Sequence, residues 1–329
     1  MKAVQISRFG GPEVLEAIQV PMPTLQPGEV LVRVHAIGVN FADTLMRQNR
    51  YAVTPPLPVI LGSEAAGVVE ALGPGAEGFE IGQRVAAPLF ATPSGLGAYA
   101  EYVALESGLV APMPDALSFE QAAAVMNQGL TALYLTRQAP PNGKTVLVNA
   151  AAGGVGLLLI QLARRAGART VIGAASTEDK LNVVRSLGAD IGVNYTQTDW
   201  VERVRAATDA AGPQIIYESA GGEVTGASLK ALAAQGQIVI YGALNIQSFQ
   251  LGIGELIQLI FKNQSLTGFA FQPLLTPAGL KTGLAELSDL VVQGELRATI
   301  GGRFPLEDAS AAHRAMEARQ TTGKLILNP

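Results

Sequence analysis

The middle of the chain alternates between two patterns of hydrophobic and polar positions. Short apolar runs suit strands that are buried on both faces, and stretches with apolar positions at helical spacing separate them. The runs lie at residues 145–149, 170–175, 191–193, 214–217 and 237–241. The helical stretches lie near residues 157–162, 178–187, 200–207 and 224–234. This order predicts an α/β domain over residues 125–265, with a parallel sheet covered by helices on both faces.

The first third of the chain has a different pattern. Apolar and polar residues alternate over 30–36, and similar short runs follow at 67–72 and 84–87. Twelve of the 19 prolines precede residue 115, which disfavours long helices there. We therefore expect a twisted, mainly antiparallel β domain over residues 1–124.

The last stretch of the chain, residues 266–329, repeats neither pattern for long. It predicts helices at 280–292 and 307–319 and strands at 298–300 and 324–327. A segment of this length is too short to bury a core of its own. We expect it to return and complete the first domain.

A glycine-rich turn joins the first expected strand of the α/β domain to the helix that follows it. Residues 151–156 match G-x-G-x-x-G, with Ala151 in the first glycine position. Glycines let the backbone approach a pyrophosphate, and the N–H groups at the start of the helix face its negative charge. The turn indicates a Rossmann-fold nucleotide-binding domain in which Gly153, Gly154 and Val155 contact the cofactor.

Composition and charge narrow the choice of partner. The chain has 23 basic and 27 acidic residues, which argues against nucleic acid because a phosphate-tracking surface needs clustered positive charge. The longest apolar run, near residues 256–261, is too short to span a membrane. The first residues lack the charged and apolar regions of a signal peptide, so we expect a cytoplasmic protein without a membrane partner.

The order of the two domains resembles the medium-chain dehydrogenase/reductase superfamily over essentially the whole chain. Alcohol dehydrogenases of that superfamily bind catalytic zinc with cysteine and histidine and carry a Gly-His-Glu motif. The matching segment here has Ser63 in the histidine position, and the chain contains no cysteine. His35 and His313 are the two histidines, and we interpret them as strand or surface residues. Zinc needs about four nitrogen or sulfur ligands in a structural site, or three with an open position in a catalytic one. Neither set is available and a site of carboxylates alone is improbable, so we expect no metal.

Within that superfamily the chain resembles the zinc-independent quinone oxidoreductases, the ζ-crystallin-like branch. The resemblance is carried by residues 9–15, 38–44, 129–132, 150–156 and 323–327. It implies a GroES-like catalytic β domain, a Rossmann domain that binds NADPH, and a homodimer. Two departures bear on the substrate: Leu45 stands where the branch often has an aromatic residue, and residues 259–269 look more like the enoyl-thioester reductases.

The expected preference for NADPH over NADH rests on charge. Rossmann domains that prefer NAD place a carboxylate at the end of the second strand, where it accepts from the ribose 2′-hydroxyl. Here that strand ends at Ser176, and Lys180 follows one helical turn later. A hydroxyl and an ammonium suit a 2′-phosphate. Glu178 and Asp179 are read as acids at a helix N-terminus, although either could instead turn back to the ribose.

The resemblance implies further residues around the cofactor. Tyr195 is expected near the adenine, Thr131 and Asn40 near the nicotinamide, and Phe269 along the cleft. The ends of the later strands, where such sheets bind ligands, contribute Ser219, Tyr241 and Gly242. Core packing of the aromatic residues and a turn-forming role for Asn40 are the alternatives.

The expected reaction follows from the missing zinc ligands. Without a metal to polarise a ketone, the acceptor must take up hydride readily, as quinones and α,β-unsaturated carbonyls do. Asn40 and Tyr51 are the candidate catalytic residues, with the Tyr51 phenol as the candidate donor to the developing oxyanion and a plain loop aromatic as its alternative. The main alternatives are an enoyl-thioester or alkenal reductase, and an NADPH-binding protein with little turnover.

Overall fold

The computed structural model describes residues 1–242, 244 and 250–329. The chain divides into two compact units: unit 1 comprises Met1–Leu130 and Leu274–Pro329, and unit 2 comprises Thr131–Pro273. The predicted fold class, a parallel Rossmann-type sheet plus a mainly antiparallel β domain, is confirmed. Relative to the expected boundaries, residues 125–130 fall in unit 1 and residues 266–273 fall in unit 2.

Unit 2 is built on a six-stranded parallel sheet with strand order β11-β10-β9-β12-β13-β14. Its apolar strands are buried by helices, which explains their continuous hydrophobic runs. The strands are β9 (Thr145–Val148), β10 (Thr170–Ala175), β11 (Ile191–Asn194), β12 (Ile215–Glu218), β13 (Gln237–Ile240) and β14 (Ser265–Gly268). The edge strand β14 was not among the strands expected from the sequence.

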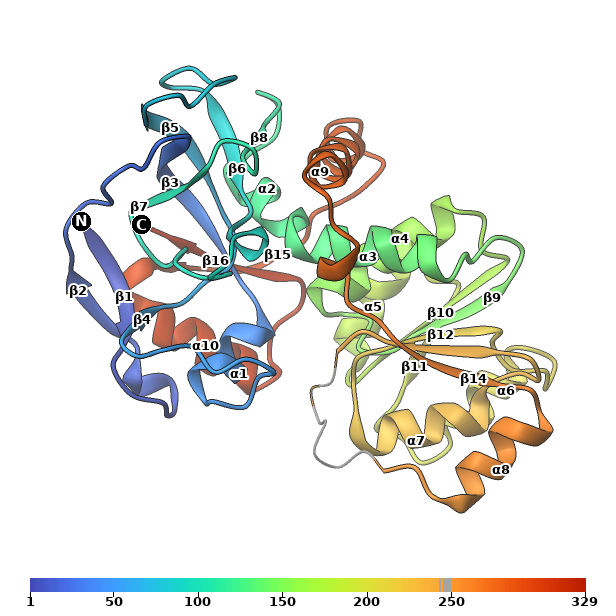
Figure 1. Ribbon diagram of the computed structural model, residues 1–329. Helices are drawn as coiled ribbons and strands as arrows, with labels where there is room; N and C mark the ends of the chain where they lie inside the picture. The colour runs from blue at the N-terminus through green and yellow to red at the C-terminus, as the bar shows by residue number, and fades with distance from the viewer. Residues whose placement is uncertain (243, 245–249) are drawn as a thin grey trace. The chain divides into compact units, whose positions relative to one another are not determined.

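Helices cover both faces of this sheet (Figure 1). One face carries α3 (Asn127–Gln138), which begins just before the division between the units, with α4 (Gly154–Arg165) and α5 (Glu178–Ser186). The other face carries α6 (Trp200–Ala206), α7 (Gly222–Ala231) and α8 (Ile253–Phe261). Trp200, Val204 and Leu229 pack there against strand residues such as Ile172 and Ile216. The helical patterns thus cover a core shared with the strands.

Unit 1 contains a seven-stranded sheet in the order β15-β16-β3-β5-β6-β8, with β7 also paired to β3. Its strands are β3 (Glu29–Val39), β5 (Ala65–Leu72), β6 (Arg84–Ala87), β7 (Tyr102–Glu106), β8 (Ala111–Pro112), β15 (Ile300–Pro305) and β16 (Lys324–Asn328). The C-terminal stretch returns to this sheet through β16, which pairs antiparallel with β3.

The expected bounds of one strand in the C-terminal stretch were wrong. The strand placed at 298–300 begins at Ile300 and continues to Pro305. Gly301 and Gly302 have low strand propensity and hid its extent in the sequence. The structure also explains why glycine is needed at residue 301, because a Cβ on Gly301 would lie 2.0 Å from the carbonyl oxygen of Thr322.

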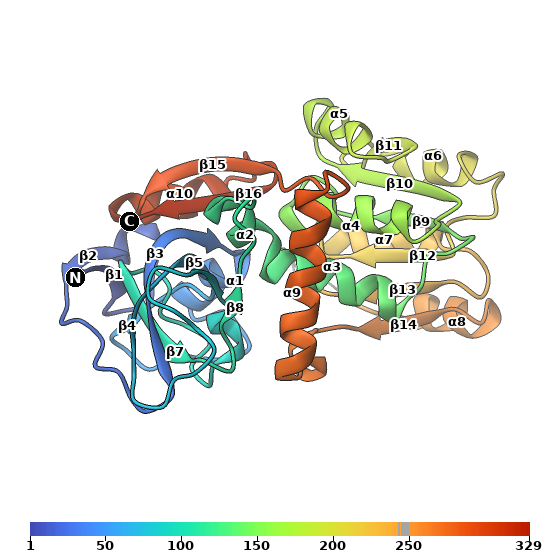
Figure 2. The ribbon, with the colours of Figure 1, turned by 90° about the horizontal axis from the view of Figure 1, so that it is seen from above.

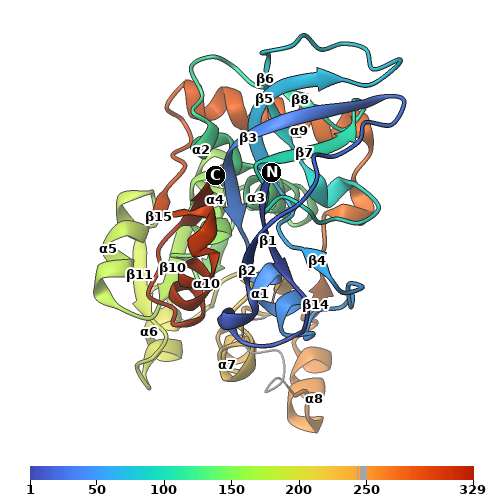
Figure 3. The same ribbon diagram turned by 90° about the vertical axis from the view of Figure 1, so that its left-hand side faces the viewer.

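A smaller sheet, β2-β1-β4, and four helices complete unit 1. Figure 3 shows α1 beside α10, and Figure 2 shows α2 beside β16; Ala123 of α2 packs on Ala36 and Ile326. The elements are β1 (Lys2–Ile6), β2 (Glu16–Gln19), β4 (Val59–Ile60), α1 (Phe41–Arg47), α2 (Phe119–Val125), α9 (Pro277–Val292) and α10 (Ala309–Glu317).

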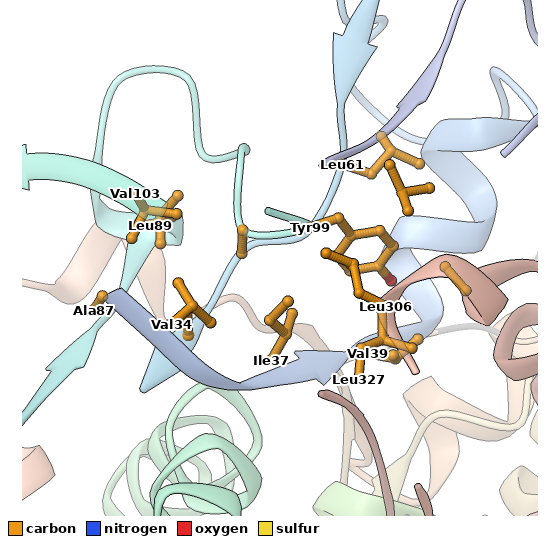
Figure 4. Packing of buried hydrophobic residues seen from close by; sticks show 14 of the residues in the cluster. Val34, Ile37, Val39, Leu61, Ala87, Leu89, Tyr99, Val103, Leu306 and Leu327 are labelled. Atoms are coloured by element: carbon orange, nitrogen blue, oxygen red, sulfur yellow. The ribbon is translucent and has the colours of Figure 1, made fainter. Parts of the chain in front are cut away.

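The core of unit 1 packs aliphatic side chains from β3 and β16 around one aromatic ring (Figure 4). Tyr99 is fully buried between Leu61, Ile37 and Leu306, and its hydroxyl is the single oxygen in the view. Burial of such side chains is worth roughly 1.5–3 kcal/mol each. The buried hydroxyl requires a polar partner, which leads to the networks described below. Over the residues described, none of the helices is both long and apolar enough to cross a membrane.

Candidate functional site

The glycine turn of unit 2 leaves the start of α4 open. Gly153 is the N-cap residue, and no side chain caps the helix. Gly153 is exposed and Gly154 and Val155 are half-buried, so the N–H groups of the first turn can meet an anion. A Cβ on Gly156 would lie 2.6 Å from the carbonyl oxygen of Ala151, so only glycine allows this helix to begin so close to the turn.

The turn lies at the point where the chain reverses direction across the sheet. From β9 the chain moves to β10 and β11, and it then returns to β12 on the other side of β9. Ligands of such sheets bind outside the carboxyl ends of the strands at this switch point. Ser219 follows β12, and its hydroxyl donates to the Tyr241 phenol oxygen (3.1 Å) just after β13. Gly242 is close by, since its Cβ would lie 3.3 Å from that of Ser219.

A buried carboxylate supports the same strand ends. Asn149 Nδ2 donates to the carboxylate of Glu218 and to the Ser228 hydroxyl (2.8 Å for the latter). Glu218 also accepts the N–H of Gly221 at 2.9 Å, and burial raises the pKa of its carboxyl. This pair was not expected from the sequence. The available signal was a polar residue directly at the end of each of two buried apolar strands.

The ends of β10 and β11 bring together three residues expected at the 2′-phosphate and adenine. The Tyr195 N–H donates to the carbonyl oxygen of Ala175 (3.2 Å), so Tyr195 lies beside Ser176. Thr177 caps α5 by accepting from the N–H of Lys180 (3.3 Å), which places Lys180 in the first turn.

The Glu178 carboxylate accepts from Arg185 at 2.5 Å. It is therefore held on the exposed side of α5, as expected of an acid at a helix N-terminus. This contact disfavours the alternative in which Glu178 turns back to a ribose.

Two further residues expected near the cofactor lie on separate elements of unit 2. The Phe269 N–H donates to the carbonyl oxygen of Ile240 (2.8 Å), so half-buried Phe269 follows β14 beside Tyr241. Thr131 is a half-buried residue of α3. The hydrogen bonds of the strand ends thus place Ser219, Tyr241 and Phe269 close to one another, whereas Thr131 comes from a helix on one face of the sheet.

In unit 1, Asn40 is the N-cap residue of α1 and its amide is fully engaged within the protein. Its Nδ2 donates to Glu64 Oε1 (2.7 Å) and to the Ser63 hydroxyl (3.3 Å), and its Oδ1 accepts from Lys324 Nζ (2.8 Å). Both amide hydrogens therefore have partners. Asn40 is better described as a positioning residue than as a direct donor to a substrate.

Glu64 and Lys324 form a fully buried ion pair beside Asn40. The other carboxylate oxygen of Glu64 accepts the N–H of Asn127 at 2.7 Å. A Cβ on Gly38 would lie 2.5 Å from Glu64 Oε1 and 2.6 Å from Lys324 Cε, so the pair fits only because residue 38 is glycine. A buried pair needs such complete hydrogen bonding to offset its desolvation. Neither residue was expected from the sequence to have a role, although each is a charged residue inside a run of apolar or small residues.

A second buried network links α1 to α10. Asp43 Oδ2 accepts the Asn40 N–H (2.8 Å) and the Tyr99 hydroxyl (3.1 Å), and burial raises the pKa of Asp43 to about 7. Tyr99 also contacts His313 Nε2 at 2.9 Å, and Arg47 contacts His313 Nδ1 at 3.5 Å. Because arginine only donates, Nδ1 accepts and Nε2 carries the hydrogen. Burial, with Arg47 nearby, lowers the pKa of His313 to about 3.

The interpretation of His313 as a surface or strand residue was therefore wrong. It is a fully buried helical residue, and the sequence gave no partner for it because Tyr99 and Arg47 lie far away along the chain. His35 does lie in a strand, β3, where its ring stacks on Phe119. Within the parts of the chain that the structure describes, no three histidine or acidic side chains are grouped to hold a metal.

Tyr51 lies in the loop after α1 and is 39% exposed. Partial burial, together with the negative charge of Asp43, raises the pKa of its phenol. The group therefore keeps its hydrogen at neutral pH and can donate it.

Comparisons with known proteins agree with this arrangement. A family described as alcohol dehydrogenase GroES-like domain matches residues 26–115, and one described as zinc-binding dehydrogenase matches residues 154–288. A quinone oxidoreductase of Pseudomonas aeruginosa is 39% identical, covering 100% of this chain and 99% of its own. A 2-haloacrylate reductase of a Burkholderia species is 35% identical, covering 99% and 98%.

A solved structure gives the same result in three dimensions. The quinone oxidoreductase of Escherichia coli, complexed with NADPH, has a TM-score of 0.92 and 33% identity, with complete coverage of both chains. Identity of this level over the full length, with both units matched, shows common family membership. The chain is an oxidoreductase that belongs to the quinone oxidoreductase branch of the medium-chain dehydrogenase/reductase superfamily.

Proposed function

We propose that the protein uses NADPH to reduce a quinone or a related conjugated carbonyl without a metal. The observation that carries the proposal is the uncapped start of α4 at the switch point of the sheet, with Ser176 and Lys180 at the next strand end. A pyrophosphate suits the first feature, and a 2′-phosphate suits the second. The relative of known structure that is complexed with NADPH supports the same choice.

The residues present fit this cofactor. Gly153, Gly154 and Val155 offer N–H groups, and the buried Asn149–Glu218 pair keeps the neighbouring strand ends in place. When bound, NADPH supplies a hydride. The protein then has to orient the acceptor and stabilise negative charge on its carbonyl oxygen, and conjugation of the acceptor lowers the barrier that zinc lowers in related dehydrogenases.

The experiment is NADPH oxidation followed by absorbance with a panel of quinones, 2-enals and enoyl-thioesters. We expect turnover with quinones or enals, faster with NADPH than with NADH. Tight NADPH binding with no turnover on any acceptor would instead identify a nucleotide-binding protein.

An enoyl-thioester or alkenal reductase is the second candidate. The 2-haloacrylate reductase among the relatives favours a conjugated double bond as the reduced group. The two candidates differ in acceptor and share the hydride chemistry, so the same panel separates them.

We also propose a homodimer formed through unit 2. Its edge strand β14 pairs on one side only within the described residues, and α8 presents large apolar side chains to solvent. Ile260 is 71% and Phe261 is 83% exposed. An apolar face next to an open strand edge is typical of a surface that a second copy covers.

A further inference from the structure

The buried network of unit 1 ends in a hydroxyl. Lys324 Nζ donates to Asn40 Oδ1 (2.8 Å), and Asn40 Nδ2 donates to Ser63 Oγ (3.3 Å). Ser63 Oγ is thus an acceptor from this chain, while its own hydrogen has no acceptor among the residues that the structure describes. Hydrogen bonds in a chain polarise one another, so the ammonium strengthens Ser63 as a donor.

The exposed fraction of the residues rises along the network from its charged end to its amide and hydroxyl end. Glu64 is 0% and Lys324 is 1% exposed, whereas Asn40 is 6% and Ser63 is 7% exposed. The charged groups are sealed inside unit 1, and the amide and hydroxyl form the end nearest the surface. Since both hydrogens of the Asn40 amide are used, the Ser63 hydroxyl is the donor left at that end.

The backbone around Ser63 is held on both sides. The carbonyl oxygen of Ser63 accepts the Phe90 N–H (2.7 Å), and that of Gly62 accepts the Ala98 N–H (3.0 Å). Gly62 has a φ of +87°, and the Tyr99 ring occupies the space of its missing side chain. A donor fixed in this way needs little reorganisation when charge develops on a ligand.

We propose that the Ser63 hydroxyl donates a hydrogen bond to the carbonyl oxygen of the acceptor during reduction, which rests on the proposed function. NADPH would supply the hydride by loss of a C–H bond and would be oxidised to NADP⁺. The hydride would form a C–H bond to the conjugated acceptor, the π electrons would move onto the carbonyl oxygen, and that oxygen would then take a proton from water. Ser63 stabilises the oxyanion without losing its hydrogen. Lys324 and Asn40 act as positioning residues for it.

The test compares Ser63→Ala with Ser63→Thr, which keeps the hydroxyl. We expect Ser63→Ala to lower kcat roughly 10- to 150-fold, the range for a hydrogen bond to a charged group. The loss should be larger with a 2-enal than with a quinone, because a quinone delocalises the charge better. The Kd for NADPH should stay unchanged, and Ser63→Thr should recover most of kcat.

A binding measurement adds a readout independent of turnover. 4-Nitrophenolate, an oxyanion, is titrated into the NADP⁺ complex by calorimetry, and Ser63→Ala should weaken its binding while Ser63→Thr does not. Ser288→Ala, at a buried serine of α9, is the matched control and should change neither quantity. Ser63→Cys, which keeps the volume with a weaker donor, carries the comparison if Ser63→Ala does not fold.

The outcomes distinguish this inference from the proposed function. An active wild-type enzyme with unchanged kcat and unchanged nitrophenolate binding in Ser63→Ala would overturn the role of Ser63 alone. A wild-type protein that oxidises NADPH with none of the acceptors would overturn the reductase and the role of Ser63 together.

Discussion

Tyr99 and His313 share a hydrogen bond of 2.9 Å although they lie 214 residues apart in the sequence. The bond joins the segment before β7 to α10, and through Tyr99 it connects His313 with Asp43. The two titratable ends of this network have pKa values displaced in opposite ways: burial raises that of Asp43 to about 7 and lowers that of His313 to about 3.

These displacements predict a pH dependence of stability with two opposing slopes. In the folded protein Asp43 keeps a proton that the same side chain loses in the unfolded chain above its ordinary pKa. The contribution of Asp43 to the free energy of unfolding therefore falls as pH rises from about 4 to 7. In the folded protein His313 stays neutral at pH values where the same side chain is protonated in the unfolded chain. The contribution of His313 to the free energy of unfolding therefore rises from about pH 3 to 6.5. Each slope is about 1.4 kcal/mol per pH unit, and between about pH 4 and 6.5 they cancel.

Single substitutions should expose each slope. Urea unfolding of Asp43→Asn at several pH values should show stability that rises with pH in that window relative to the wild type, because His313 is then the remaining titrating end of this network. His313→Gln, which keeps one donor and one acceptor, should show stability that falls. Parallel curves for the wild type and both variants would contradict the assigned pKa values.

Cofactor preference should depend on Lys180. Lys180→Ala should weaken NADPH binding roughly 10- to 150-fold, because a charge-assisted contact to phosphate is worth about 1.5–3 kcal/mol. Binding of NADH, which lacks that phosphate, should hardly change. The comparison is made by fluorescence titration of both cofactors, and an equal loss for the two would mean that Lys180 does not contact the 2′-phosphate.

The glycine turn should be indispensable for nucleotide binding. Gly154→Val places a branched side chain at the start of α4 and should abolish NADPH binding. Gly226→Ala in α7, where a Cβ meets open space, is the control and should bind normally. Circular dichroism and thermal melting of the free proteins separate a binding defect from unfolding. A folded Gly154→Val protein with wild-type affinity would refute the assignment of this turn.

Activity should survive removal of metals. Ser63 occupies the histidine position of the zinc dehydrogenases, and the neighbouring Glu64 is committed to Lys324 and Asn127. We therefore expect unchanged turnover after treatment with a chelator, with the metal content of the protein measured by elemental analysis. Stoichiometric zinc whose removal abolishes activity would contradict this expectation.

The apolar face of α8 should control oligomeric state. Phe261→Glu places a charge on this face and should convert a dimer into a monomer in sedimentation velocity experiments. Ile81→Glu changes another strongly exposed apolar residue, which lies in unit 1, and should leave the dimer intact. A wild-type monomer at micromolar concentration would refute the dimer itself.

The sequence predicted the sheet of unit 2 well because its signal is local. Buried parallel strands such as β10 and glycine turns such as 151–156 can each be identified from a short run of contiguous residues. Edge strand β14 was not expected because Ser265–Gly268 is half polar. Helix α8 was not expected because the apolar run near residues 256–261 was considered only as a possible membrane span.

The polar networks of unit 1 were not predictable in the same way. Lys324 meets Asn40 and Glu64 from 284 and 260 residues away, and no local pattern announces such a pairing. Asn40 itself was selected by resemblance, and only the structure shows that its amide is already occupied. For Glu64 and Lys324 the signal in the sequence was a charged residue within a run of small or apolar residues, which indicates a buried charge.

The return of β16 to β3 has a consequence for the order of events on the ribosome. Unit 2 is one continuous segment, so it can fold as soon as it has emerged. Unit 1 receives Lys324 only after all of unit 2 has been synthesised, and until then Glu64 is a carboxylate without its cation. Nascent chains that end before β16 would therefore contain a complete unit 2 and an incomplete unit 1.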